Sequence, residues 1–281
     1  MPTCFYMKFN VFVISSLLSF VLSGPTAKSE KAAYELRENI PYIELEKVSD
    51  TYRKKRCQLD LYYPPSRKAF PTVVWFHGGG LRSGEKSIPK QLRQQGIAVV
   101  APNYRLFPRA KCPDYLEDAA AAVAWTFRNI DKLGGDPRLI FVSGHSAGGY
   151  LTSMVGLDKS YLAKHGINAD KIAGLIPFSG HTITHFTPRE ERGISKKQVV
   201  VDKFAPIFHL RKEASPILII TGDRELEMLG RYEENAYFWR MLKVVGHPNI
   251  QILEMPGFNH RGMASPAFAA LLKFVKKQSS L

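Results

Sequence analysis

Cysteine is scarce in this sequence, with three residues in a chain of 281. Such a low content excludes a small scaffold held together by disulfides. The cysteines and the eight histidines form no cluster with the ligand spacing of a zinc site, so we expect no bound metal. Cys57 and Cys112 would pair only if their Cα atoms lay close enough, and the sequence leaves this open.

A hydrophobic run long enough to cross a bilayer is missing near the N-terminus. The apolar run there covers residues 11–22 and is interrupted by serines, whereas a membrane-spanning helix needs about 20 residues. Lys8 precedes the run and small residues follow it up to Ala27, which is the pattern of a secretory signal peptide. We therefore expect a signal peptide at 1–27, a mature chain at 28–281, and a secreted or periplasmic protein without a permanent membrane anchor.

Acidic residues are outnumbered, 25 against 39 Lys and Arg, which gives a formal net charge of +14 at pH 7. A basic surface attracts anionic partners, or it simply keeps the protein soluble. The basic residues are scattered, which favours solubility. Only residues 53–56, Arg-Lys-Lys-Arg, form a run, and they lie in a predicted strand or hairpin. Nothing in this pattern indicates nucleic-acid binding.

Strands and helices alternate along most of the chain, without internal repeats. This order predicts one α/β domain with a mostly parallel sheet flanked by helices. Residues 40–63 favour two antiparallel strands at a sheet edge, and residues 179–212, which have no clear period, predict a small cap or substrate loop. The expected strands are 72–76, 97–101, 139–142, 172–178, 217–221 and 250–254, and the expected helices are 86–95, 114–132, 146–156, 231–245 and 265–277.

Residues 144–148 read Gly-His-Ser-Ala-Gly and follow an apolar predicted strand directly before a predicted helix. A G-x-S-x-G segment in this context resembles the nucleophile elbow of α/β hydrolases. Glycines permit the tight turn, and the turn exposes the serine hydroxyl at a helix N-terminus. The pattern predicts Ser146 as a nucleophile.

A glycine run, His-Gly-Gly-Gly at residues 77–80, follows the predicted strand 72–76. Acyl transfer builds negative charge on a carbonyl oxygen, and backbone N–H groups aimed at that oxygen stabilise it. Glycine lets the backbone approach a substrate closely. We therefore predict that the amides of Gly78, Gly79 and Ala147 form an oxyanion hole.

A serine nucleophile needs a base to take its proton. In α/β hydrolases this histidine follows the serine and the acid in the chain. His260 fits best, because it lies in a loop directly after the last predicted strand. His247 lies in a turn on the opposite side of that strand, and His181 and His185 belong to the predicted cap, where substrate contacts are the expected role.

The base in turn needs a carboxylate that orients it. Asp223 is the leading candidate, because it ends a strongly apolar predicted strand, and α/β sheets place their sites at the carboxyl ends of strands. Asp202, Glu225 and Glu227 are the alternatives. Asp118 lies in a helix before the serine, where a structural ion pair is expected.

From about residue 40 to 277, the chain resembles the branch of α/β hydrolases that contains hormone-sensitive lipase and bacterial acetyl xylan and feruloyl esterases. The resemblance implies a cofactor-free, two-step acyl transfer through Ser146, with His260 activating the water. Many relatives carry an aromatic residue where this chain has Leu81, so the acyl pocket cannot be carried over. The matching segments are 77–80, 103–106, 134–137, 144–149, 221–223 and 259–260.

The expected function is a serine carboxylic ester hydrolase that acts on short acyl groups, with acetyl or feruloyl groups on polysaccharide as candidate substrates. The alternatives are a hydrolase similar to kynurenine formamidase, a general small-ester hydrolase, and an inactive binding protein of the same fold. The expected partner is a small or polysaccharide-linked ester, and the sequence does not indicate an oligomeric state. The polar character of residues 179–212 argues against a long-chain lipase.

Overall fold

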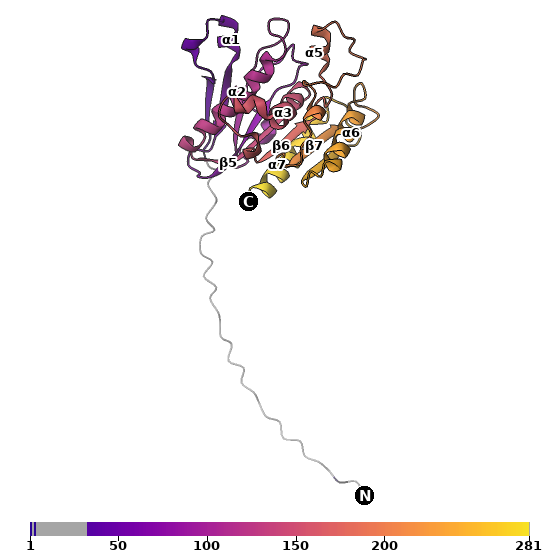
Figure 1. The fold of residues 1–281 in the computed structure, drawn as a ribbon. Coiled ribbons are helices and arrows are strands. Elements are labelled where there is room, and N and C mark those ends of the chain that lie inside the picture. The colour runs from indigo at the N-terminus through magenta and orange to yellow at the C-terminus, as the bar shows by residue number, and fades with distance from the viewer. Residues whose placement is uncertain (2, 4–32, 281) are drawn as a thin grey trace. The chain divides into compact units, whose positions relative to one another are not determined.

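The fold is taken from a computed structural model, which describes residues 1, 3 and 33–280 (Figure 1). The predicted signal peptide at 1–27 therefore lies outside the described residues except for its first and third positions. Within the described part of the chain, no helix is both long and apolar enough to span a membrane.

An eight-stranded sheet, in the order β1-β2-β4-β3-β5-β6-β7-β8, forms the centre of residues 33–280. The strands from β4 to β8 run parallel, and β1 and β2 add an antiparallel edge. This confirms the predicted α/β-hydrolase sheet with an antiparallel edge, although β1 lies mostly before the range 40–63 in which both edge strands were expected. The strands are β1 (Glu35–Pro41), β2 (Gln58–Tyr63), β3 (Phe70–Phe76), β4 (Ala98–Pro102), β5 (Gly135–His145), β6 (Gly174–Phe178), β7 (Ile217–Gly222) and β8 (Ile250–Met255).

Helices cover both faces of the sheet. Figure 1 shows α2 and α3 side by side in front of it, and the residues of α7 pack on the opposite face. The helices are α1 (Thr51–Arg56), α2 (Asp114–Asn129), α3 (Ala147–Leu157), α4 (Lys159–Ala163), α5 (Phe186–Glu191), α6 (Arg231–Val244) and α7 (Ala264–Gln278), and the 3-10 helices are η1 (Leu45–Lys47), η2 (Lys90–Leu92), η3 (Asp131–Leu133), η4 (Ala169–Lys171) and η5 (Pro206–His209).

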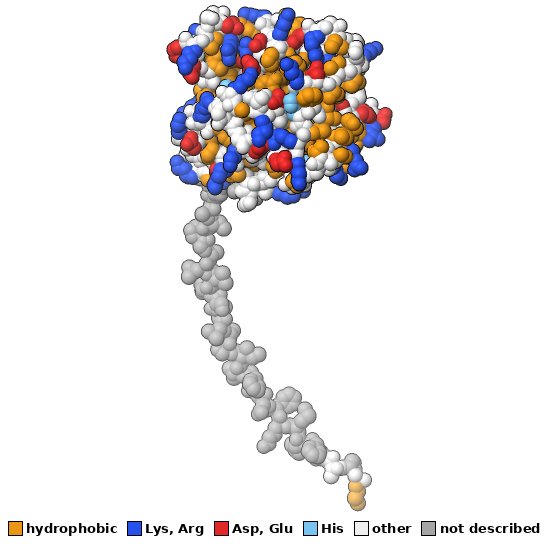
Figure 2. All heavy atoms as spheres, in the orientation of Figure 1, with side chains coloured by type: hydrophobic (Ala, Val, Ile, Leu, Met, Phe, Trp, Pro, Cys, Tyr) orange, Lys and Arg blue, Asp and Glu red, His pale blue; other side chains and the backbone are white. Residues whose placement is uncertain are grey.

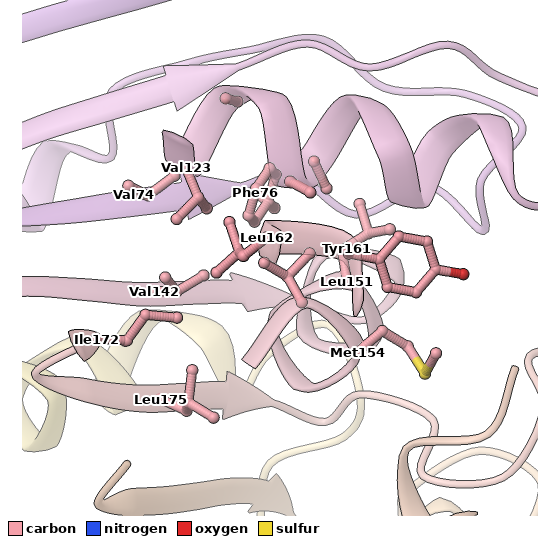
Figure 3. Packing of buried hydrophobic residues seen from close by; sticks show 14 of the residues in the cluster. Val74, Phe76, Val123, Val142, Leu151, Met154, Tyr161, Leu162, Ile172 and Leu175 are labelled. Carbon is pink, nitrogen blue, oxygen red and sulfur yellow. The ribbon is translucent and has the colours of Figure 1, made fainter. Parts of the chain in front are cut away.

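The sheet buries side chains on both faces because successive residues of a strand point in opposite directions. Val74 of β3 packs with Val142 of β5 and with Val123 and Leu151 of the covering helices (Figure 3). Trp75, the next residue of β3, belongs to the cluster under α7. The core thus holds the strand ends that carry the functional site in fixed positions.

Two expected elements near the edge of the sheet are wrong. The basic run 53–56 lies in helix α1, whose start is capped by the Asp50 carboxylate accepting from the Tyr52 amide at 2.9 Å. The helix expected at 86–95 is reduced to η2, because Pro89 cannot donate a backbone hydrogen bond inside a helix.

The basic residues do not gather into one patch on the face drawn in Figure 2. Lys and Arg side chains are spread over that face, and Asp and Glu side chains lie among them. Many are paired, as Lys164 is with Glu117 at 2.9 Å. On this face, the distribution agrees with the scattered basic residues expected from the sequence.

Cys57 and Cys112 are both free thiols in the structure, which answers the question left open by the sequence. Cys57 is fully buried in the core. Burial raises the pKa of each thiol to about 12, so both stay protonated at neutral pH. Neither has the reactivity of a thiolate.

A buried ion pair ties helix α2 to the loop after β4. The Asp118 carboxylate accepts from Nε and Nη2 of Arg105 at 2.8 and 2.9 Å, and from the Arg105 amide at 3.0 Å. The Asp118 side chain has no exposed surface. The pair confirms the structural role expected for Asp118.

Replacing Asp118 with alanine is expected to lower the free energy of unfolding by about 3–5 kcal/mol, because the buried Arg105 would lose its closest carboxylate and keep only the longer, 3.3 Å contact with Asp114. Urea denaturation followed by circular dichroism measures this change. Glu117→Ala is the matched control on the same helix: its exposed pair with Lys164 should contribute less than about 1 kcal/mol. Equal losses in the two variants would contradict the assignment.

Candidate active site

Ser146 lies between the end of β5 and the start of α3, with φ 58° and ψ −114°. This conformation is rare for a residue with a side chain and is maintained by the surrounding packing. A Cβ atom on Gly148 would lie 2.1 Å from the carbonyl oxygen of Phe76, and one on Gly144 would lie 2.6 Å from the backbone of Gly148. The two glycines are therefore required by close backbone contacts, and the turn they permit presents Ser146.

The carboxyl ends of neighbouring parallel strands bring the other candidate groups to Ser146. The glycine loop 77–80 follows β3, which pairs with β5 on one side, and Ser179 follows β6, which pairs with β5 on the other. Glu227 follows β7 and His260 follows β8, further along the same edge. Sites of open α/β sheets form at this edge.

His260 lies within hydrogen-bonding distance of both its neighbours. Its Nε2 is 2.9 Å from Oγ of Ser146, and its Nδ1 is 2.8 Å from Oε2 of Glu227. With Nδ1–H donating to the carboxylate, Nε2 is free to accept the serine proton. The structure thus brings together the two residues that the sequence placed as nucleophile and base.

The carboxylate that contacts His260 is Glu227, so the prediction of Asp223 for this position is wrong. Asp223 does end β7, but its two oxygens accept from the amides of Glu225 and Gly257, at 2.9 and 2.7 Å. A turn follows, in which the Glu227 amide donates to the Asp223 carbonyl at 2.9 Å. This turn returns the longer Glu227 side chain to His260, while Asp223 ties the turn to the loop that carries His260.

Glu227 is held as a carboxylate in a nearly closed site, with 1% of its side chain exposed. Burial alone would raise its pKa, but hydrogen bonds from His260 and Ser179, the charge of His260 and the Gly222 amide outweigh burial and lower the pKa to about 2. The Gly222 amide donates to Oε1 at 3.0 Å. Glu227 is therefore ionised at neutral pH.

Ser179 is a member of this network that the sequence did not single out. Its hydroxyl donates to Oε1 of Glu227, and its Oγ lies 3.0 Å from Nδ1 of His260. Its position directly after β6, the neighbour of β5, was the available signal. Ser179 positions the carboxylate, because Oε1 bonded to Ser179 leaves Oε2 for His260.

The glycine loop lies against the nucleophile elbow. A Cβ atom on Gly78 would be 3.4 Å from Cβ of Ser146, and Gly79 adopts a φ of +109° that favours glycine. Among the described residues, no acceptor is bonded to the amides of Gly78, Gly79 or Ala147. Tyr104 fixes the start of the loop by donating from its hydroxyl to the carbonyl of residue 77 at 2.8 Å.

His145, next to the nucleophile, has a separate place in the site. Burial and the nearby His260 lower the pKa of His145 to about 4, so its ring is neutral. Its Nε2 lies 2.7 Å from the His260 carbonyl oxygen and donates to it. The contact fixes the backbone of His260 relative to the turn that carries Ser146.

Two of the other histidine candidates and Asp202 have partners elsewhere. His181 bonds to Glu234 at 2.8 Å, and His247 lies 3.0 Å from the carbonyl of residue 214. Asp202 pairs with Arg192 at 2.6 Å. In the described residues, no three His, Cys, Asp or Glu side chains are grouped as metal ligands would be.

The family model BD-FAE matches residues 59–228, which is more than half of the chain. The chain belongs to the BD-FAE family. The matched range includes Ser146, Ser179 and Glu227, whereas His260 lies beyond its end.

Curated relatives of this BD-FAE member include two proteins of Mycobacterium tuberculosis. Esterase LipC is 28% identical over 69% of this chain and 53% of LipC. Carboxylesterase NlhH is 37% identical over 34% of this chain and 32% of NlhH. The chain thus spans about half the length of LipC and a third of NlhH.

Solved structures share the fold of this BD-FAE member. A truncated carbohydrate esterase from gut microbiota matches with a TM-score of 0.72 and 20% identity, over 90% of this chain and 99% of the other. Esterase 2 of Thermogutta terrifontis matches with a TM-score of 0.64 and 24% identity, over 88% of this chain and 94% of the other. These matches establish the α/β-hydrolase fold.

Proposed function

We propose that the protein is a carboxylic ester hydrolase in which Ser146 is the nucleophile, His260 the general base and Glu227 the acid that orients the base. The proposal rests on two contacts of His260: its Nε2 lies 2.9 Å from Oγ of Ser146, and its Nδ1 lies 2.8 Å from Oε2 of the buried Glu227. The membership in BD-FAE and the similarity to esterases LipC and NlhH support it.

In the first half-reaction, Ser146 Oγ attacks the ester carbonyl carbon while His260 Nε2 takes the hydroxyl proton. The charge that develops on the imidazole is stabilised by the Glu227 carboxylate, which stays ionised. The carbonyl oxygen becomes an oxyanion, and the amides of Gly78, Gly79 and Ala147 donate to it. His260 then gives its proton to the departing alcohol, which leaves an acyl group on Ser146.

In the second half-reaction, a water molecule takes the place of the alcohol. His260 removes a proton from the water as it attacks the acyl carbon, and the same amides stabilise the second oxyanion. The bond to Ser146 Oγ breaks, His260 returns the proton to Oγ, and the acid is released. In both half-reactions, every proton is transferred to or from His260, so the reaction needs no proton carrier other than this residue.

The proposed substrates are short-chain acyl esters, with acetyl or feruloyl groups on polysaccharide as the favoured class. The carbohydrate esterase with the same fold supports this choice. The segment 179–212 between β6 and β7 carries only α5 and η5 among its residues and offers no long apolar helix for a lipid surface. Export, proposed from the apolar run 11–22, would bring the enzyme to such a polymer.

The test is the specific activity of the full chain on the 4-nitrophenyl esters of acetate, butyrate and octanoate, and on acetylated xylan. We expect kcat/KM to fall by about tenfold or more from acetate to octanoate, since a short acyl pocket excludes added methylenes, and acetate to be released from the polymer. Highest activity on octanoate would contradict the short-acyl assignment. Faster hydrolysis of N-formylkynurenine than of any ester would favour a formamidase.

A further inference from the structure

A cavity of about 180 Å³ lies between the 181–199 part of the β6–β7 segment and the start of α6. Its lining combines apolar side chains with the basic and polar side chains of His181, Arg189, Lys196, Lys197 and Glu234. None of these residues belongs to the proposed catalytic triad of Ser146, His260 and Glu227 or to the glycine loop.

Short stretches of chain and one aromatic ring connect the wall of the cavity to the proposed catalytic residues. Leu229 in its wall is two residues beyond Glu227, and His181 is two residues beyond Ser179. The ring of Phe186 lies 5.3 Å from the ring of His181. The Phe186 ring also lies beside the end of the glycine loop, because a Cβ atom on Gly80 would be 3.2 Å from it.

Arg189 is a buried cation without an anion in the described chain. The residue is 3% exposed, and its Nη1 donates to the carbonyl of Gln198. Its Nε is buried with no partner, and no carboxylate of the described residues forms an ion pair with it. Burying an unpaired guanidinium is costly, so a bound anion would remove an existing penalty.

His181 contributes a complementary acceptor to the same cavity. It is 2% exposed, its Nδ1 donates to Glu234 at 2.8 Å, and its Nε2 is buried without a partner. Burial and the nearby Arg231 lower the pKa of His181 to about 4, so Nε2 carries a lone pair at neutral pH. Such an atom accepts a hydrogen bond from a hydroxyl group.

The net charge around the cavity is positive. Glu234 is already compensated by Arg231, whose Nε lies 3.2 Å from its carboxylate. Lys196, which is part of the lining, pairs at 3.2 Å with Glu190, which is not. Arg189 and the exposed Lys197 remain to attract a negative group.

We propose that this cavity is a subsite for a sugar acid in the ester substrate, with the carboxylate paired with Arg189 and a ring hydroxyl donating to His181. Among the described residues that line the cavity, Arg189 offers a donor and His181 an acceptor that lack partners, and a carboxylate with a hydroxyl would match them. The inference rests on the proposed esterase function and narrows its substrate to acylated acidic polysaccharide.

The test compares acetate release from acetylated oligogalacturonate and from acetylated xylo-oligosaccharide of equal length. We expect the full chain to favour the uronate ester, and Arg189→Gln to reduce that preference by about 10- to 100-fold, the contribution of a hydrogen bond to a charged group. Arg192→Gln is the matched control: it removes the same charge three residues away, from a side chain paired with Asp202 outside the cavity lining. It should keep the preference.

A second variant guards against misfolding of Arg189→Gln. Lys197→Glu changes an exposed residue of the lining and should lower activity on the uronate ester more than on the neutral ester. Equal activity of the unmodified protein on the two sugar esters would overturn the subsite. So would cleavage of a sulfated, acetylated galactoside as fast as cleavage of the acetylated uronate. Activity on 4-nitrophenyl acetate in the same preparation separates failure of the subsite from failure of the esterase proposal.

Discussion

Ser146→Ala is expected to lower kcat for 4-nitrophenyl acetate by about 10⁶-fold, the loss typical of removing the nucleophile from a serine triad. The variant has no atom that can form the acyl intermediate, so only binding and the oxyanion amides remain to accelerate attack by water. Initial rates at saturating substrate measure the change.

Ser143→Ala is a suitable control for Ser146→Ala. Its hydroxyl donates to the carbonyl of Ile176 at 2.6 Å inside the sheet, three residues before the nucleophile. It should lower stability by about 1 kcal/mol while leaving kcat within a few-fold. Retention of most activity in Ser146→Ala would contradict the proposed nucleophile.

Glu227→Gln is expected to lower kcat by about 10⁴-fold, the effect of the equivalent acid-to-amide change in a serine triad. The amide is nearly isosteric, but it removes the negative charge that stabilises the His260 imidazolium. Its NH₂ group also favours the wrong tautomer of His260, with the proton on Nε2. Kinetics at several pH values, with circular dichroism to confirm folding, measure this loss.

Asp223→Asn separates the two carboxylates that follow β7. The amide oxygen of Asn still accepts from one of the two backbone amides that Asp223 holds, at Glu225 or Gly257. We expect kcat to fall by less than about tenfold, because one hydrogen bond in the turn is weakened and the His260 contact is retained. A larger loss from Asp223→Asn than from Glu227→Gln would restore the original assignment.

The positions of Ser146 and of the glycine loop at the strand ends were predictable because local backbone geometry determines them. A serine between glycines at a strand-to-helix turn has few structural roles, and the contacts of Gly144 and Gly148 with neighbouring backbone explain why no larger residue fits. The mostly parallel sheet was equally accessible, since alternating strands and helices imply parallel strand pairing. These features need only short-range information.

The carboxylate that contacts His260 could not be identified from the sequence, because the contact depends on a turn. Asp223 has the right residue type at the right strand end, but backbone amides occupy its carboxylate. Glu227 reaches His260 only because the chain reverses in the next four residues. A pattern of residue types does not show which of two nearby carboxylates will accept hydrogen bonds from backbone amides and which will contact the histidine.

Errors in the secondary structure had local causes of the same kind. Residues 53–56 have no apolar period that separates helix from strand, and the Asp50 cap decides in favour of helix α1. Pro89 interrupts a stretch whose composition otherwise suits a helix. Neither error affects the strand ends that position Ser146 and His260.

Covalent labelling tests the central claim, an activated nucleophile at Ser146, most directly. The full chain is treated with an organophosphate 4-nitrophenyl ester, and intact mass and peptide mapping locate the adduct. The account predicts one adduct per chain, on Ser146, formed much more slowly in Glu227→Gln and at a similar rate in Asp223→Asn. No adduct, or an adduct on another residue such as Ser179, would contradict it.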